Sequence, residues 1–499
     1  MFTQSYLPLL AIMFPLLAII PRPFIIKDQN DDYFYSVIVC LLTFLIVISM
    51  WPQIKAGKIL DLSVDTGLGI NFSFRADMLG LFMGILSSFL WMISSVYAVE
   101  YMKSSHAYSR YNTFSLLSLG GMMGVVFTGN LFSLYIFFEL LSVSSAILVF
   151  HEETDEAMKA GLKYLFLGIT GGLFLLFAII LTYSIAGTGD ITMIGIGLDG
   201  SPWLPWIFWG YIIGFGVKAG MFPLHIWLPS AHPVAPSPAS ALLSGVMIKA
   251  GAYGILKTVY NIIGYESITK SYTGILLILL IISLITIFLG SACAISQREI
   301  KKMLAYSSIS QIGYIIMGIC LLAHNGLVGA LVHIFAHCLM KGTLFLCAGA
   351  IIHQTGLRNL SELKGIGKKM PVTSFAFTIS ALSMVGIPPF IGFISKWFLA
   401  LGTLECMRTG SYWSGIGIIS LVTLLISSLL NLIYYGPVVI GAWMHNNSEN
   451  EHIDLSKKEA NYIMIIPIIL LTFGVFIFGI FPSIPLAAAR RISQVFFLK

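Results

Sequence analysis

Long apolar segments recur along the whole chain, and they constrain its fold more than any other feature. Each contains about 20 residues, which is enough for a helix to cross the roughly 30 Å hydrocarbon layer of a bilayer. Of the 499 residues, 57% are hydrophobic and 10% are charged, whereas soluble domains carry about 25% charged residues. The sequence therefore predicts an all-α integral membrane protein that lies in the lipid bilayer.

Fourteen candidate spans can be placed along the sequence. Their approximate cores are 6–25, 33–51, 77–100, 113–129, 131–150, 160–186, 204–228, 239–262, 273–295, 304–323, 327–352, 373–402, 413–443 and 461–485. The seventh contains Pro223, and the twelfth contains Pro388-Pro389. Proline interrupts helix hydrogen bonding, and such breaks are tolerated at membrane depth only inside protein or beside water. We therefore expect spans seven and twelve to be broken in mid-membrane, close to Lys218 and Lys396.

The distribution of Lys and Arg over the loops predicts the orientation of these spans. The odd-numbered loops hold fourteen Lys and Arg residues, whereas the even-numbered loops and the C-terminal tail hold nine. Basic residues collect in cytoplasmic loops of membrane proteins. The odd loops, including residues 358–369, are therefore expected to be cytoplasmic, with both termini on the outer face.

A faint internal repeat suggests how the spans are organised. Residues 139–148 resemble 304–313, and residues 161–166 can be aligned with 331–335, at a shift of 165 to 170 residues or five helices. Because five is odd, the second unit would be inserted upside down, as in many transporters. Chance likeness between apolar segments is the alternative explanation. The expected divisions are N-terminal helices 1–3 at 1–112, a first five-helix unit at 113–262, a second at 273–443, and a C-terminal helix and tail at 461–499.

Few ionisable side chains lie inside the expected spans, and nearly all of them are lysines. The five basic residues there are Lys163, Lys218, Lys249, Lys341 and Lys396. Glu139 is the only acid well inside a span, and His333 and His337 lie in the eleventh. A charged side chain at the bilayer centre costs about 2.5–3.5 kcal/mol on insertion scales. These groups must therefore be paired, hydrated or neutral for part of the time.

The residue types favour proton transfer. A desolvated ammonium group releases its proton readily, whereas a guanidinium group stays charged, and imidazole titrates near neutrality. His333 and His337 share a helix face at i,i+4 spacing, and Lys341 continues that face. Glu139 could pair with a lysine and hold it protonated. We expect Gly245 and Gly251 to leave room for water beside Lys249.

Several of these residues also have structural explanations. Lys163 lies near the start of its span and could extend to the interface, and Lys341 could fix helix packing. The histidine pair has a zinc-like spacing, but the sequence shows no third ligand, so no metal site is predicted. His232, between spans seven and eight, is either a loop residue or a link between Lys218 and Lys249.

The sequence lacks the motifs of other chemistries. It contains no phosphate loop, dinucleotide-binding fingerprint, iron–sulfur spacing or nucleophile motif, and its six cysteines form no CxxC pair. No basic patch with interleaved aromatic residues indicates nucleic-acid binding. The chain is therefore expected to draw energy from an ion gradient or from a partner.

Four segments resemble the antiporter-like subunits of respiratory complex I, Mrp-type Na⁺/H⁺ antiporters and energy-converting membrane-bound hydrogenases. The segments are 216–233, 240–254, 300–313 and 333–341, which resemble the family's motifs in helices seven, eight, ten and eleven. The resemblance extends over roughly residues 70 to 440, in the same order. It implies fourteen helices with inverted five-helix units (helices 4–8 and 9–13) and broken helices 7 and 12.

The resemblance also implies roles for the buried residues. Glu139 and Lys218 would form an ion pair, Lys249 would be the central carrier, His333 and His337 would continue the relay, and Lys396 would lie near its exit. The phrase at 232–249 looks most like the Mrp-D-like subunits associated with hydrogenases.

This likeness implies a subunit of a complex in a prokaryotic cell membrane. Its partners would be further antiporter-like and small Mrp-type membrane subunits, and it would hold no cofactor itself, with any nickel–iron or iron–sulfur sites in partner chains. The transported ion would be H⁺, with Na⁺ left open. The Mrp-D-type component of a secondary Na⁺/H⁺ antiporter is the alternative, and a structural paralogue that no longer conducts is a third.

Overall fold

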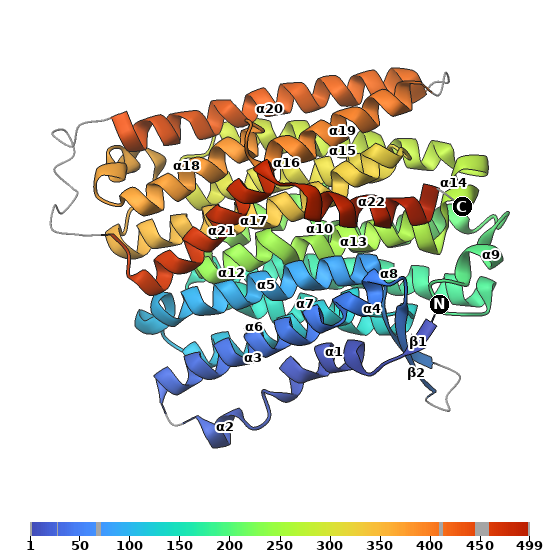
Figure 1. Ribbon diagram of the computed structural model, residues 1–499, viewed down its shortest axis with the longest axis horizontal. Coiled ribbons are helices and arrows are strands. Elements are labelled where there is room, and N and C mark those ends of the chain that lie inside the picture. Colours follow the sequence, from blue (N-terminus) through green and yellow to red (C-terminus); the bar gives the residue numbers. More distant parts are fainter. Residues whose placement is uncertain (1, 27, 66–70, 409–412, 445–458, 498–499) are drawn as a thin grey trace.

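The computed structural model describes residues 2–26, 28–65, 71–408, 413–444 and 459–497, and its helices run side by side in one bundle (Figure 1). Among these described residues, eleven helices are long and apolar enough to cross a membrane. Three further expected spans coincide with the shorter helix α1, with the more polar α6 and with the interrupted pair α18–α19. Lys27, Lys457, Lys458 and Lys499, which contribute to the orientation argument, lie outside the described residues.

The N-terminal third combines helices with three short strands. Its elements are β1 (Phe2–Gln4), α1 (Leu7–Leu17), α2 (Arg22–Ile25), α3 (Gln29–Ser49), α4 (Trp51–Lys55), β2 (Ile59–Asp65), β3 (Asn71–Ala76), α5 (Met78–Tyr101), η1 (Met102–Ser104) and α6 (Tyr108–Val126).

The middle of the chain contains the first interrupted span. Its elements are α7 (Leu131–Phe150), α8 (Asp155–Ala186), α9 (Ile194–Leu198), α10 (Leu204–Ala219), η2 (Leu224–Trp227), α11 (Leu228–Val234), α12 (Ser237–Leu242), the π-helical turn η3 (Leu243–Met247), α13 (Ile248–Lys257), η4 (Thr258–Ile262) and α14 (Tyr265–Ser271).

The last part contains the second interrupted span. Its elements are α15 (Thr273–Ile295), α16 (Ile300–Cys320), α17 (His324–Thr355), η5 (Leu360–Leu363), η6 (Ile366–Lys368), α18 (Pro371–Val385), α19 (Ile391–Met407), α20 (Trp413–Met444), α21 (Tyr462–Ile480) and α22 (Ser483–Phe497).

The small sheet is a departure from the all-α expectation. Strand β2 pairs in parallel with β1 and antiparallel with β3, with Leu60 opposite Ala76. Arg75 fastens this sheet to the bundle, because its guanidinium contacts Asp61 at 2.7 Å and Asp190 at 2.9 Å. Figure 1 places the sheet at the same end of the bundle as both chain termini. These strands lie outside the apolar segments, so hydropathy could not indicate them.

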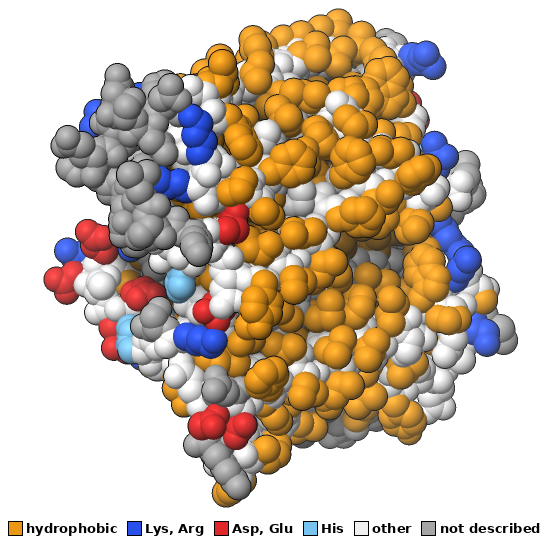
Figure 2. Space-filling model, turned by 60° about the vertical axis from the view of Figure 1, so that its left-hand side comes forward, with side chains coloured by type: hydrophobic (Ala, Val, Ile, Leu, Met, Phe, Trp, Pro, Cys, Tyr) orange, Lys and Arg blue, Asp and Glu red, His pale blue; other side chains and the backbone are white. Residues whose placement is uncertain are grey.

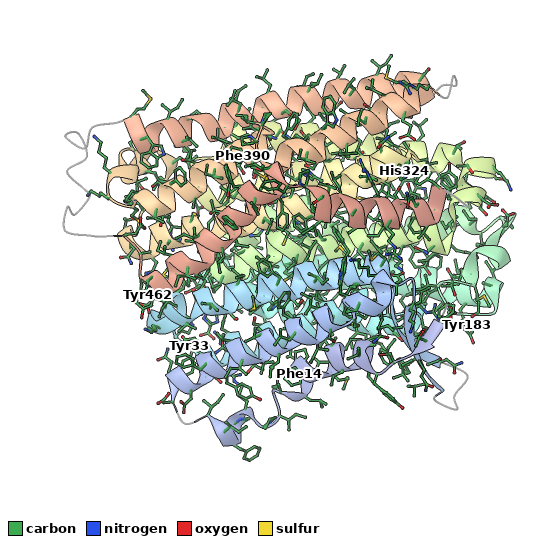
Figure 3. All side chains as sticks on the ribbon, in the orientation of Figure 1. Phe14, Tyr33, Tyr183, His324, Phe390 and Tyr462 are labelled. Carbon is green, nitrogen blue, oxygen red and sulfur yellow. The ribbon has the colours of Figure 1, made fainter. Side chains whose placement is uncertain are left out.

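Both expected breaks are present. Helix α10 ends at Ala219, and Gly220 follows with a φ of +72°; helix α18 ends before Gly386, which has a φ of +96°. Glycine adopts this left-handed backbone without the steric penalty of a Cβ atom. Figure 3 shows Phe390, directly after the second break, midway between the end marked by Tyr462 and the end marked by His324. The second break is therefore near the middle of the bundle.

The surface between the two ends is largely apolar. In Figure 2 hydrophobic side chains form a broad continuous area, and charged side chains gather at its margins. Large apolar residues are exposed on helices such as α8 and α21, where Phe166 and Phe473 are 65% and 60% accessible. Such a surface is unfavourable in water and is suited to lipid or to partner helices. The chain is thus a multi-pass integral membrane protein.

Candidate functional site

Lys218 lies in the last turn of α10, immediately before the first break. Its buried ammonium group donates to the Tyr164 hydroxyl at 2.6 Å, to Ser145 Oγ at 3.0 Å and to the Leu141 carbonyl at 3.4 Å. The Tyr164 ring is itself held by stacking on Trp227, with ring centroids 4.0 Å apart. Neutral oxygens from α7 and α8 therefore surround this ammonium group.

The predicted ion pair between Glu139 and Lys218 is wrong as a direct contact. Among the described residues no ion pair within 4.0 Å joins them, although their charges are close enough to interact. The Tyr164 and Ser145 hydroxyls take the hydrogen bonds that the carboxylate was expected to accept. Glu139 instead packs against Gly172 of α8, and its buried Oε1 has no hydrogen-bond partner among the described residues. The carboxylate is thus near the lysine but separate from it.

Lys249 lies at the start of α13, directly after the π-helical turn η3. Its buried ammonium group donates to the Ser244 carbonyl and lies 2.5 Å from His337 Nδ1 on α17. A π-helical turn widens the helix, and such turns occur frequently at functional sites. Two bases from different helices are thereby placed within proton-transfer distance.

The glycines beside Lys249 do not provide space for water as expected. A Cβ atom at Gly251 would lie 2.4 Å from both Ala219 N and Phe215 O, and one at Gly245 would lie 2.2 Å from Leu90 Cδ2. These glycines instead allow α13 to pack closely against neighbouring helices. The reason is steric, since absence of a side chain lets another backbone or side chain approach.

The histidines of α17 lie in a row with Lys341. His333 Nδ1 is 2.9 Å from Ser395 Oγ, and the two imidazole rings are 6.0 Å apart. Their Nε2 atoms are buried and have no hydrogen-bond partner among the described residues. Lys341 donates to the Leu304 carbonyl at 2.8 Å and to Ser307 Oγ. The expected shared face of α17 is therefore buried and lined with bases.

Lys396 lies on α19, shortly after the second break. Its ammonium group donates to the Met384 and Val385 carbonyls at 2.9 and 2.8 Å, and to Ser428 Oγ at 3.0 Å. The two carbonyls are at the C-terminal end of α18, where helix hydrogen bonding stops. This confirms the expectation that a broken helix supplies free carbonyls to a buried lysine.

Two further candidates occupy less central positions. Lys163 is half-buried, and its ammonium group lies 3.3 Å from Ser230 Oγ of α11, so it does not extend freely into the interface. His232 belongs to helix α11 and is fully buried against Phe345, with ring centroids 4.5 Å apart. Its charge would interact with those of Lys249 and Lys341. The loop interpretation of His232 is therefore wrong.

Sequence reasoning missed two buried lysines. Lys301 donates to the Ala235 carbonyl at 2.9 Å, and Lys257 pairs with Asp77 at 3.0 Å. Both were assigned to loops because they lie near the ends of apolar segments. The spacing of Lys257 from Lys249, two helical turns along the same face, was the available signal.

A cavity of about 600 Å³ opens beside Lys301, at the end of the bundle opposite the termini. Its lining includes Glu152, Asp155, Glu156 and His353, together with the end of α11 that follows His232; the acidic and histidine side chains gathered at this end are visible in Figure 2. Solvent and positively charged ions can therefore approach the buried bases from this end.

His151 lies beside the cavity, just beyond the end of α7. Burial, reinforced by the positive charge of Arg110, lowers the pKa of its imidazole to about 4. Its Nε2 atom is 3.0 Å from Ser105 Oγ. The side chain is therefore neutral near pH 7 and serves as a hydrogen-bonding group of the loop.

Comparison with known proteins gives a consistent picture. Residues 128–427 match the family model described as "NADH:quinone oxidoreductase/Mrp antiporter, TM". NADH-quinone oxidoreductase subunit N of Desulforudis audaxviator is 33% identical over 415 residues, covering 80% of this chain and 79% of that protein. Hydrogenase-4 component B of Escherichia coli is 35% identical over 342 residues, which are 66% of this chain and only 50% of that protein.

An antiporter component and two solved structures are also similar. The Mrp-D-type component of the Na⁺/H⁺ antiporter of Alkalihalophilus pseudofirmus is 32% identical over 329 residues, covering 65% of this chain and 66% of that protein. The Mrp complex from Dietzia sp. has a chain with a TM-score of 0.87 and 20% identity, over 99% of this chain and 98% of that one. A chain of the archaeal membrane-bound sulfane sulfur reductase also has a TM-score of 0.87, at 24% identity over 98% and 97%. These two structures establish likeness of fold.

Proposed function

Since this chain belongs to the NADH:quinone oxidoreductase/Mrp antiporter membrane family, we propose that it conducts protons in a redox-driven complex. The chain is an antiporter-like subunit of the type found in Mrp, complex I and hydrogenase-type complexes. Our proposal is that the complex is a membrane-bound hydrogenase or related respiratory complex, and that protons move along its buried lysine, glutamate and histidine side chains.

The contact between Lys249 and His337 carries this proposal. Their nitrogen atoms are 2.5 Å apart in a buried environment, and proton transfer needs donor and acceptor within about 2.6–3.2 Å or one water molecule. The remaining partner of Lys249, a carbonyl of η3, cannot accept the proton fully. One proton shared by two bases can move from the α13 side to the α17 side.

The surrounding lysines extend this step in both directions. Lys218, Lys341 and Lys396 are buried, and each donates to hydroxyl or carbonyl oxygens without a carboxylate within 4.0 Å among the described residues. A neutral cage stabilises an ammonium group less than a carboxylate does, so a proton can leave more easily. Glu139 would bias Lys218 through its charge. Lys163 and His232 would serve as entry-side members of the relay.

We also propose the complete family topology. Fourteen spans with both termini on the outer face are supported by the position of both termini at one end of the bundle (Figure 1). Inverted units at 113–262 and 273–443 are supported by two interrupted helices, although Lys218 precedes its break and Lys396 follows its break. The remaining divisions would be 1–112 and 461–499. Labelling of an introduced cysteine in 358–369 by an impermeant reagent in intact cells would reverse the orientation.

The complex would contain further antiporter-like and small Mrp-type membrane subunits. The exposed apolar side chains of helices such as α8 and α20 offer surfaces for lipid or for those subunits. Any nickel–iron or iron–sulfur sites would lie in partner chains, and H⁺ would be the ion moved here. The second candidate, the Mrp-D-type component of a secondary Na⁺/H⁺ antiporter, is favoured by the 32% identity to such a protein. Purifying the complex and identifying its other chains would separate the two.

Substitution of Lys249 tests the relay directly. Lys249→Ala and Lys249→Arg should each abolish proton translocation by membrane vesicles while leaving the redox activity of partner chains partly intact. The arginine variant retains the positive charge, but guanidinium does not release its proton. Arg298→Lys, in a loop outside the relay, is the matched control and should translocate normally. Full translocation by Lys249→Arg would rule out the role of carrier.

A further inference from the structure

Helix α20 carries a row of polar side chains that the histidine relay does not use. Its lipid-facing side is apolar and exposed, as expected for an outer helix of the bundle. The opposite side, here called the α20 stripe, consists of Ser420, Ser427, Ser428, Asn431, Tyr434 and Tyr435. These residues recur at helical spacing, so they share one face. All are buried except Ser428, which is half-buried.

One part of the α20 stripe contacts Lys341. The Tyr435 hydroxyl accepts a hydrogen bond from the Lys341 ammonium at 3.3 Å and lies 3.1 Å from Ser307 Oγ. Ser307 itself accepts from Lys341 and is also a hydrogen-bonding partner of the Tyr434 phenol. The rings of Tyr434 and Tyr435 have centroids 4.6 Å apart. Three hydroxyl groups are thus gathered at one ammonium group.

Another part of the stripe reaches Lys396. Ser428 Oγ accepts from the Lys396 ammonium at 3.0 Å. Asn431 Nδ2 donates at 3.2 Å to the Met384 carbonyl, which also accepts from Lys396 at 2.9 Å. The Tyr434 hydroxyl donates to Asn431 Oδ1 at 2.5 Å. The same helix face therefore connects the surroundings of two buried lysines.

Tyr314 of α16 lies between these two parts. The Lys396 ammonium is 5.3 Å from the centroid of its ring. Its phenol group interacts with Tyr434 and forms a hydrogen bond with Ser428. Hydroxyl groups consequently lie in sequence from Ser307 through Tyr434 and Tyr314 to Ser428.

We propose that the α20 stripe, with Ser307 and Tyr314, is a second proton route from Lys341 to Lys396, parallel to the His337–His333 route. This inference rests on the proposed proton-conducting function. The Lys341 ammonium gives a proton to the first hydroxyl oxygen, and each hydroxyl passes its own proton onward as it receives one. The neutral amine of Lys396 takes up the last proton, so each oxygen regains its neutral state. Asn431 is a positioning residue, because its amide fixes the Tyr434 hydroxyl.

A purely structural role explains the stripe less well. Serine and tyrosine hydroxyls could simply link α20 to α16 and α18, since a buried hydroxyl without a partner costs about 1–3 kcal/mol. Such a link would be satisfied by bonds to backbone carbonyls alone. Here the hydroxyls also accept from Lys341 and Lys396, the two groups that must exchange a proton.

Single and double variants of the two routes test the proposal. Tyr434→Phe removes only a hydroxyl, and His333→Ala interrupts the other route. If the routes are parallel, each single variant should lower proton translocation by vesicles about twofold, and the double variant should lower it at least tenfold, beyond the product of the single effects. Tyr260→Phe is a matched control, because Tyr260 is 4% exposed like Tyr434 and its hydroxyl also makes one bond, to the Ile319 carbonyl at 3.0 Å.

Two results would overturn the second route. One is a double variant whose loss equals the product of the single losses, and the other is a Tyr434→Phe variant that is silent in both backgrounds. Should Tyr434→Phe fail to assemble, Ser428→Ala removes the oxygen at Lys396 and serves the same comparison. Lys249→Ala measured in parallel separates this inference from the proposed function. Normal translocation by Lys249→Ala would reject the relay itself, whichever route follows it.

Discussion

Replacement of Gly172 by alanine should separate proton transport from stability. A Cβ atom at this position would lie 2.3 Å from Glu139 Oε1, whereas ordinary contacts are 3.4–4 Å. The carboxylate must therefore move by about 1 Å, which it can do because it is the end of a flexible side chain. Alanine is favoured over glycine inside a helix by up to about 1 kcal/mol, so α8 should be as stable as before or slightly more stable.

The functional cost should be much larger than the structural one. A displacement of about 1 Å in a positioned catalytic group can cost about a hundredfold in rate. We expect proton translocation in vesicles to fall between about tenfold and a hundredfold, with unchanged assembly of the complex. Gly168→Ala is the matched control, because it lies one turn away on α8 and its Cβ atom would meet nothing closer than Ser142 Cβ at 4.0 Å.

The outcome bears on the position of Glu139 in particular. If Gly172→Ala translocates protons at the wild-type rate, the precise placement of the carboxylate does not matter and its influence on Lys218 is not part of the mechanism. If Gly168→Ala is impaired to the same degree, the effect belongs to the backbone of α8 and the argument also fails.

Two further predictions concern groups outside the central relay. Lys257→Met should destabilise the protein by about 3–5 kcal/mol, because it strands the carboxylate of Asp77, and Lys257→Met with Asp77→Asn should recover most of this loss in thermal unfolding measurements; equal stability of the single and double variants would contradict the pairing. The loop that contains His151 should open more readily as the pH falls from about 6.5 to about 4, because the open loop regains the ordinary imidazole pKa and binds a proton that the closed loop excludes. Hydrogen exchange of residues 151–158, corrected for intrinsic rates, should therefore be faster at pH 5 than at pH 7, and equal protection would contradict it.

Local features of the sequence were sufficient to predict most of the membrane architecture. A run of apolar residues determines whether a segment prefers lipid, whatever lies beside it, and proline interrupts a helix through its own backbone. Hence the spans and the breaks beside Lys218 and Lys396 could be predicted without knowledge of packing. The same holds for the row on α17, because His333, His337 and Lys341 share a face through helical geometry alone.

Contacts between distant segments were decided only by the tertiary structure. Lys218 meets Tyr164 and Ser145, not Glu139, because the packing of α7, α8 and α10 brings those hydroxyls within reach first. Neither the burial of Lys301 nor the polar face of α20 could be inferred from sequence spacing, since serine and tyrosine occur in lipid-facing and buried positions alike. Hydropathy measures the preference of one segment for its solvent, whereas the partner of a buried charge depends on how helices many residues apart pack together.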